Sequence, residues 1–248
     1  TFVPKLYQTT IYMKKIFAIL TFLCAACMTI HAERVYVGAE QTKLYLPLLK
    51  GKRVALLSNH TGIVIQGKDT IHTLDLLLKH GVEVTAIFSP EHGFRGTARE
   101  GEHVASSVDA KTGIPILSLY DGKSQRPSKE AMQTFDILIT DIQDVGLRFY
   151  TYYVTMYRLM NACASEGKQF MVFDRPNPNG FYVDGPILDM KHKSGVGALP
   201  IPVVHGMTLG ELALMINGEN WLNDSMKVDL TVIPCKNYTH QTLYRLPI

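Results

Sequence analysis

Short apolar runs alternate with helical patterns along most of the chain. A helix is predicted over 73–80, where Leu74, Leu77 and Leu78 have helical spacing and Gly81 follows as a natural end. Further helices are predicted over 128–134, 149–166 and 208–217, and buried strands over 53–58, 82–88, 114–119, 136–140, 169–173 and 228–233. Strands that are short and almost continuously apolar, with helices between them, predict an α/β fold. Its sheet is expected to be mostly parallel, with helices on both faces.

Residues 177–204 interrupt this pattern. The segment is rich in Gly and Pro and shows little periodicity. A connection of this length is uncommon inside a compact domain unless it has a function of its own, so we expect a functional loop here.

The N-terminal residues have the pattern of an export signal. Met13, Lys14 and Lys15 open a basic segment, an apolar stretch follows over 16–30, and Ala32 offers a cleavage site. This arrangement is typical of a secretory signal peptide and predicts a periplasmic or extracellular protein. Residues 1–32 are therefore expected to be upstream residues plus the signal. A lipoprotein signal with Cys27 as the lipidated residue, which would anchor the protein to a membrane, is the alternative.

Removal of residues 1–32 changes the charge of the chain. This segment holds three of the 25 Lys and Arg residues and none of the 22 Asp and Glu residues, so the remainder has a formal charge of zero. Nothing in this balance favours a nucleic-acid partner. Cys163 and Cys235 remain, which allows one disulfide, and the rest of the chain has no zinc-type spacing of Cys and His.

Polar residues follow several of the predicted strands. Because the carboxyl ends of parallel strands meet at one edge of a sheet, these residues are expected to converge on a ligand site. The strand ends carry four polar groups: Asn59 with His60, Glu91 with His92 and Arg95, Asp141 with Asp144, and Asp174 with Arg175.

Glu91 is the first candidate for catalysis. Its apolar neighbours Phe88 and Phe94 would raise its pKa by excluding water, so that it stays protonated near neutrality and can act as a general acid. The structural alternative is that Glu91 caps the following turn or pairs with Arg95. His92 and His60 are candidates for substrate binding or proton relay.

Asp141 and Asp144 are candidates for a second carboxylate, which glycoside hydrolysis by two carboxylates requires. The other of the two would then cap the helix that begins near Arg148. Arg148 is a candidate for binding an anionic group of the substrate, or for an ion pair with either aspartate.

Three further residues are candidates for substrate binding. Asp174 and Arg175 either pair with each other or contribute to the site. His205 precedes a capped helix, where it can present an N–H group to a ligand or serve as a turn residue.

Several common motifs are absent from the sequence. There is no GxxxxGK[ST] phosphate loop, no GxGxxG after the first strand and no GxSxG nucleophile turn. A nucleotide cofactor is therefore not expected, and no other cofactor is indicated.

Five segments, taken in chain order, resemble one known family. They read SNHTG, SPEHGFRG, DIQDVGLRFYTY, DRPNPNG and HGMTLGELA, and they resemble the bacterial exo-β-N-acetylmuramidase family. The resemblance covers residue 44 to the C-terminus. It implies a Rossmann-like N-terminal domain and hydrolysis of terminal, non-reducing β-linked N-acetylmuramic acid from peptidoglycan fragments. Glu91 occupies the position of the family's proposed catalytic glutamate.

The resemblance also implies a domain organisation. Members of the family are longer and end in a second, smaller domain. Residues 33–222 are therefore expected to form the Rossmann-like catalytic domain, and 223–248 the start of a truncated C-terminal domain. Two alternative functions remain open: a non-catalytic glycan-binding module, and a metal-dependent hydrolase that uses His60, His92 and Asp141.

Overall fold

The computed structural model of the protein describes residues 13, 33–90, 94, 107–119 and 126–247. The described helices and strands from residue 35 onward belong to one compact unit, Val35–Ile248. Among the described residues, no helix combines the length and the apolar character needed to cross a bilayer.

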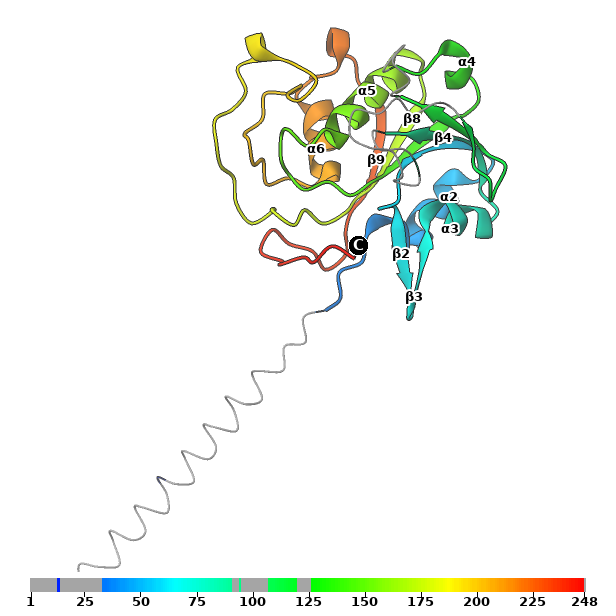
Figure 1. Cartoon of the computed structure of the whole chain (residues 1–248), viewed down its shortest axis with the longest axis horizontal. Coiled ribbons are helices and arrows are strands. Elements are labelled where there is room, and N and C mark those ends of the chain that lie inside the picture. The colour runs from blue at the N-terminus through cyan, green and yellow to red at the C-terminus, as the bar shows by residue number, and fades with distance from the viewer. Residues whose placement is uncertain (1–12, 14–32, 91–93, 95–106, 120–125, 248) are drawn as a thin grey trace, which may run out of the picture. The chain divides into compact units, whose positions relative to one another are not determined.

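A mostly parallel sheet forms the centre of this unit (Figure 1). In the described part of the chain it has seven strands in the order β5-β6-β4-β1-β7-β8-β9. Neighbouring strands are parallel except β5 and β6. The strands are β1 (Arg53–Ser58), β4 (Glu83–Ser89), β5 (Ser107–Val108), β6 (Pro115–Ser118), β7 (Ile137–Asp141), β8 (Gln169–Phe173) and β9 (Asp229–Ile233).

The order of the six parallel strands is that of the Rossmann fold, with β1 as the first strand of one half and β7 as the first strand of the other. The chain reverses its direction of travel across the sheet at β1, and ligands of such sheets bind beyond the carboxyl ends of the strands at this point. The Rossmann-like α/β fold expected from the sequence is therefore confirmed.

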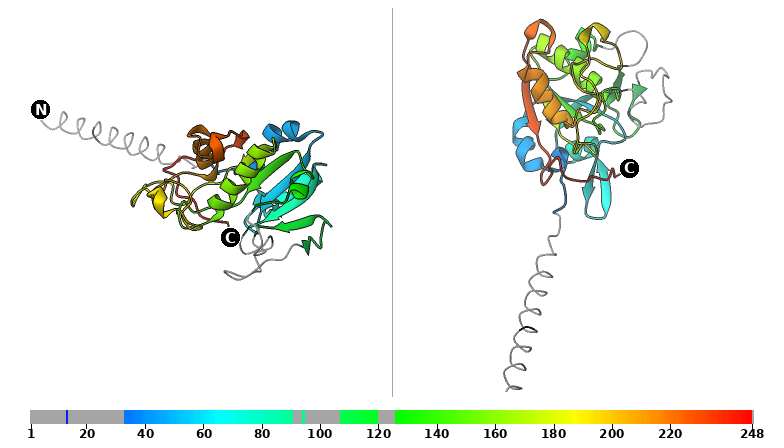
Figure 2. Two further views of the ribbon diagram at one scale, coloured as in Figure 1. Left: turned by 90° about the horizontal axis from the view of Figure 1, so that it is seen from above. Right: turned by 90° about the vertical axis from the view of Figure 1, so that its left-hand side faces the viewer.

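Helices cover both faces of the sheet (Figure 1, Figure 2). Within β1, Val54 and Leu56 pack in one buried cluster, while Ala55 and Leu57 pack in another. The first cluster includes side chains of α2 (Thr42–Leu49) and α3 (Thr73–Lys79). The second includes side chains of α4 (Lys129–Met132), α5 (Tyr152–Ser165) and α6 (Leu209–Gly218). Alternate residues of one strand thus hold opposite layers together, and each fully buried aliphatic side chain contributes roughly 1.5–3 kcal/mol.

The helix expected from residue 149 begins later, at Tyr152. Residues before it are engaged in backbone pairing instead, because Leu147 bridges to Val204 and Arg148 N donates to Val203 O. Asp144 consequently does not cap the helix, and the N-cap residue is Thr151. Ser128 and Thr208 cap α4 and α6, because the side chain of each accepts a hydrogen bond from the first turn of its helix.

A hairpin lies outside the main sheet and was not expected from the sequence. It pairs β2 (Ile63–Gln66) with β3 (Asp69–His72) around Gly67, which has a φ of +66°. Helix α2 was also not expected from the sequence, because it contains Pro47. Three short 3-10 helices complete the described elements. The 3-10 helices are η1 (Gly38–Glu40), η2 (Met190–His192) and η3 (Asn223–Ser225).

The strand that was expected to open a second domain pairs with a strand of the main sheet. β9 pairs in parallel with β8 over five positions, from Gln169 with Asp229 to Phe173 with Ile233. β9 thus extends the sheet at the edge of β8 through backbone hydrogen bonds, and the division of the chain at residue 222 stays a prediction. Cys163 and Cys235 are both free thiols, so the disulfide that the sequence allowed is not formed.

Candidate active site

Three strand ends meet at the carboxyl edge of the sheet. Ser58 at the end of β1 donates from its hydroxyl to Asp141 O at the end of β7, at 2.7 Å. Arg175, just beyond β8, reaches the same Asp141 with its guanidinium. The convergence expected from the sequence is thus observed for β1, β7 and β8. Glu91, His92 and Arg95, which follow β4 in the sequence, lie outside the described residues.

Asp141 forms a closed ion pair with Arg175. Both side chains are buried, and Arg175 Nε and Nη2 donate to Asp141 Oδ1 and Oδ2 at 2.6 and 2.9 Å. Thr73 Oγ1 adds a further bond to Oδ2. A buried carboxylate with both oxygens engaged in this way is held in place and has little capacity left for a substrate.

Asp174 does not form a side-chain ion pair with Arg175, which was one of the two alternatives from the sequence. It accepts only the backbone N–H of Arg175, at 3.0 Å. Its other partners are Thr208 Oγ1 at 2.7 Å and Gly210 N at 2.8 Å, so Asp174 fixes the start of α6 to the end of β8. Burial raises the pKa of Asp174 to about 6, and these hydrogen bonds oppose the shift.

Asn59 and His60 are neighbours with different environments. Asn59 is fully buried, donates to Tyr152 Oη at 2.9 Å and accepts from the backbone and hydroxyl of Thr61. His60 is exposed and lines a cavity of about 220 Å³ together with Gln143 and Tyr150. Of the two, only His60 is in a position to meet a ligand at this edge.

Arg148 is occupied by the long loop over 177–204. Its Nη1 donates to Pro186 O and to Ile201 O, each at 2.7 Å. These carbonyl contacts replace the ion pair with Asp141 or Asp144 that the sequence allowed. Arg148 therefore orders the loop beside the site.

Asp144 differs from all of these residues. It is 6 % exposed, and its Oδ1 accepts from Gly146 N at 2.7 Å. Its Oδ2 is buried and has no hydrogen-bond partner among the described residues. Burial raises the pKa of Asp144 to about 7, although backbone N–H groups act in the other direction. A carboxylate with a free oxygen and a pKa near neutrality can accept or donate a proton at physiological pH.

His205 is joined to the turn that follows Asp144, because its backbone N–H donates to Gly146 O at 3.1 Å. Met207 N donates to His205 Nδ1 at 3.3 Å, which leaves the proton of the neutral ring on Nε2. Nε2 is buried without a partner in the described part of the chain. Burial also lowers the pKa of His205 to about 4, which keeps the imidazole neutral. The ring therefore offers one unused N–H donor.

A tight turn and one amide fix the backbone near Asp144 and near His205. Gly146 has a φ of +73°, and a Cβ there would lie 2.2 Å from Asn177 Nδ2. Asn177 in turn donates to Met207 O at 2.8 Å, next to His205. The sequence prediction missed Asn177 and Gln143, although both occur in polar segments that follow predicted strands. Gln143 Nε2 donates to the carbonyls of Asp144 and Pro176, and its Oε1 is unpartnered within the described residues.

No set of three His, Cys, Asp or Glu side chains that could hold a metal ion occurs among the described residues. His92, one member of the metal set considered from the sequence, is outside them. The described site offers two buried carboxylates of raised pKa, Asp144 and Asp174, of which only Asp144 has an oxygen without a partner in the described part of the chain. It also offers one neutral imidazole, that of His205, and a closed ion pair between Asp141 and Arg175.

Fold and site together define a Rossmann-like α/β protein with a polar site at the switch point of its sheet. Residues 54–248 match the family described as "Exo-beta-N-acetylmuramidase NamZ, N-terminal". The chain therefore belongs to this family, as the resemblance of its motifs indicated.

Individual relatives agree with this assignment. The chain is 46 % identical over 196 residues to the peptidoglycan beta-N-acetylmuramidase NamZ of Bacillus subtilis (strain 168), a match that covers 78 % of the chain and 45 % of that protein. Two crystal structures of DUF1343 family proteins from Bacteroides fragilis superpose with a TM-score of 0.76 each. The first is 63 % identical to this chain, and the match covers 87 % of this chain and 56 % of that protein. The second is 37 % identical, and the match covers 84 % of this chain and 52 % of that protein. The chain thus spans about half the length of these relatives.

Proposed function

We propose that this chain is the Rossmann-like part of an exo-β-N-acetylmuramidase that removes terminal, non-reducing N-acetylmuramic acid residues from peptidoglycan fragments. The observation that supports this most strongly is membership of the NamZ family over residues 54–248. The substrate class follows from the name of the Bacillus subtilis relative. Export fits this substrate, because peptidoglycan lies outside the cytoplasmic membrane, and the sequence of residues 13–32 supplies the expected signal.

Glu91 is the proposed general acid. It occupies the position of the family's proposed catalytic glutamate, and it follows β4, the neighbour of β1 in the sheet, by two residues in the sequence. A general acid protonates the oxygen of the leaving sugar while the bond to the anomeric carbon breaks.

Asp144 is the proposed second carboxylate, in preference to Asp141. Both oxygens of Asp141 accept hydrogen bonds from Arg175 or Thr73, whereas Oδ2 of Asp144 has no partner among the described residues. The raised pKa makes Asp144 a stronger base than a solvated carboxylate, which suits activation of water or stabilisation of an oxocarbenium-like transition state. The proposed role of His205 is to donate its neutral N–H to a substrate oxygen, which its unpartnered Nε2 supports.

The test is release of a chromophore from a chromogenic β-N-acetylmuramide by the intact protein that contains this chain. We expect release by the wild type and a loss of at least about 100-fold in Glu91→Gln, the range typical of a lost general acid. Equal release by wild type and variant would exclude Glu91 as the acid.

The same protein preparation also tests the alternative function. A rise in melting temperature with muropeptides, together with no release of sugar, would identify a glycan-binding module. Loss of turnover on chelation, restored by a divalent metal, would identify a metal-dependent hydrolase.

A further inference from the structure

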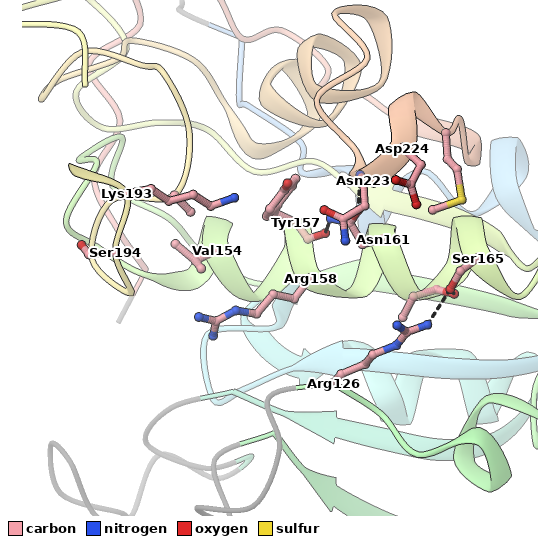
Figure 3. Close-up of a pocket in the computed structure, with 13 residues that line it drawn as sticks. Arg126, Val154, Tyr157, Arg158, Asn161, Ser165, Lys193, Ser194, Asn223 and Asp224 are labelled. Carbon is pink, nitrogen blue, oxygen red and sulfur yellow. Dashed lines mark hydrogen bonds between the residues drawn. The ribbon is translucent and has the colours of Figure 1, made fainter. Parts of the chain in front are cut away.

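A second cavity lies along α5 (Figure 3), and its lining includes none of the residues described for the candidate active site. Its volume of about 490 Å³ is within the range of about 300–1,000 Å³ that is typical of small-molecule sites. The residues that line it from α5 recur at helical spacing and form one stripe: Val154, Tyr157, Arg158, Asn161, Ala162 and Ser165. None of them belongs to the group around Asp144 and His205.

Basic residues outnumber acidic residues in the lining of this cavity. Arg126, Arg158 and Lys193 line it against a single carboxylate, Asp224. Arg126 is also within 3.9 Å of Glu166, so Arg158 and Lys193 are the two lining cations without an ion pair among the described residues. Residues 33–248 as a whole carry equal numbers of acidic and basic residues. Such a concave, basic surface attracts anions.

Two of the three cations are available to a ligand. Arg158 is half-buried and forms no hydrogen bond or ion pair with any residue that the structure describes. Lys193 has its Nζ 5.4 Å from the centre of the Tyr157 ring, which orients the ammonium group without neutralising it. Arg126, by contrast, donates to Ser165 Oγ at 2.7 Å at the other end of the stripe.

The walls of the cavity are rigid and mixed in character. Tyr157 is buried and donates to Trp221 O at 3.0 Å, and Asn161 joins α5 to η3 by accepting from Asn223 N at 2.7 Å. Val154 and Ala198 add buried apolar surface. This combination suits a small organic molecule with an anionic group at one end, because guanidinium pairs with planar oxyanions and the apolar wall covers the remainder.

We propose that this cavity binds a small ligand that carries a carboxylate or phosphate group, with Arg158 and Lys193 as the residues that hold the anion. Anion binding here does not require the catalytic activity proposed above. Two sources share this chemistry: a carboxylated sugar such as N-acetylmuramic acid, and a phosphate compound.

Titration calorimetry with three probes tests this binding. N-acetylmuramic acid and N-acetylglucosamine differ by the lactyl carboxylate, and inorganic phosphate represents the other source. We expect an anionic probe to bind at least about tenfold more tightly than N-acetylglucosamine, as a charged hydrogen bond of about 1.5 kcal/mol or more implies. Tighter binding of the sugar acid assigns the carboxylate source, and tighter binding of phosphate assigns the other.

Variants locate the binding. Arg158→Gln is expected to lower the affinity for the anionic probe at least about tenfold. Lys193→Gln is expected to lower it severalfold. Lys68→Gln, an equal loss of charge in the β2–β3 turn, is expected to leave the affinity unchanged. Thermal unfolding of Arg158→Gln like that of the wild type shows that the fold is intact. Equal affinity in Arg158→Gln and wild type, or no binding of either anion, would overturn the proposal, whatever the outcome of the glycosidase assay.

Discussion

Asp141, at the end of β7, and Asp144, three residues beyond it, are both buried but differ in their hydrogen bonds. Asp141 has both oxygens engaged by Arg175 and Thr73, whereas Asp144 keeps Oδ2 without a partner among the described residues. An unpaired buried carboxylate lowers stability, so a protein retains it only where something else requires it. The contrast separates a residue whose side chain joins strand ends from one that keeps a buried oxygen without a partner in the described structure.

The largest expected effect is on stability and concerns Asp141. In Asp141→Asn the guanidinium of Arg175 stays buried without a countercharge, which is expected to lower the free energy of unfolding by about 3–5 kcal/mol. Urea unfolding followed by circular dichroism measures this. Asp136→Asn is the matched control, because its ion pair with Arg53 is about 40 % exposed and is expected to matter far less. Equal losses of unfolding free energy in the two variants would show that the buried ion pair of Asp141 contributes no more than an exposed one.

Asp144 is expected to show the reverse behaviour. Asp144→Asn gives up no bond at Oδ2 and removes the penalty of burying a charge, so its stability is expected to match or exceed that of the wild type. Its rate on a chromogenic β-N-acetylmuramide is expected to fall about 100-fold, equivalent to about 2.7 kcal/mol in the barrier. A stable variant with full activity would show that the second carboxylate lies elsewhere.

This contrast was only partly visible in the sequence. Alternating apolar runs were enough to predict β1, β7 and β8, because a strand buried on both faces must be apolar at nearly every position. The same pattern predicted that Asp141 and Asp144 would lie at one edge. The sequence could not say which of them would be paired, since that depends on Arg175, 34 residues from Asp141 and brought to it by the neighbouring strand.

Long-range pairing also explains the errors. The helix expected from residue 149 begins at Tyr152, because Leu147 pairs with Val204 across the fold. The sequence of β9 likewise does not reveal that it pairs with β8, because the pairing joins residues about 60 positions apart. The orphaned groups on Asp144 and His205 are likewise a property of the tertiary fold, not of local spacing.

The dependence of stability on pH sharpens the comparison further. Asp144 has a pKa of about 7 when folded against an ordinary 3.8, so the folded state holds a proton that the unfolded state has lost. This lowers stability as pH rises from about 4 to about 7. His205 acts oppositely, because its pKa of about 4 lies below the ordinary 6.5, and stability rises with pH across about 4–6.5.

Replacement of either residue is expected to leave the pH dependence of stability that is due to the other. Relative to wild type, Asp144→Asn is expected to gain up to about 1.4 kcal/mol of stability per pH unit between about pH 4 and 7. His205→Gln is expected to change the slope in the opposite sense. Urea unfolding at half-unit pH intervals measures both slopes. Profiles parallel to that of the wild type would mean that folding shifts the pKa of neither group.

Asp174 is intermediate between the two aspartates and gives the smallest effect. It is buried and satisfied, but by neutral donors, and Thr208 supplies one of them while also capping α6 through Glu211 N at 3.2 Å. Thr208→Ala removes both bonds and is expected to cost about 1–2 kcal/mol in the free energy of unfolding. Thr208→Ser keeps the hydroxyl and is expected to recover most of that loss. If Thr208→Ser is no more stable than Thr208→Ala, the methyl group of the threonine and not its hydroxyl stabilises this junction. The hydrogen bond from Thr208 to Asp174 would then contribute nothing measurable, and Asp174 would resemble Asp144 in lacking a stabilising partner.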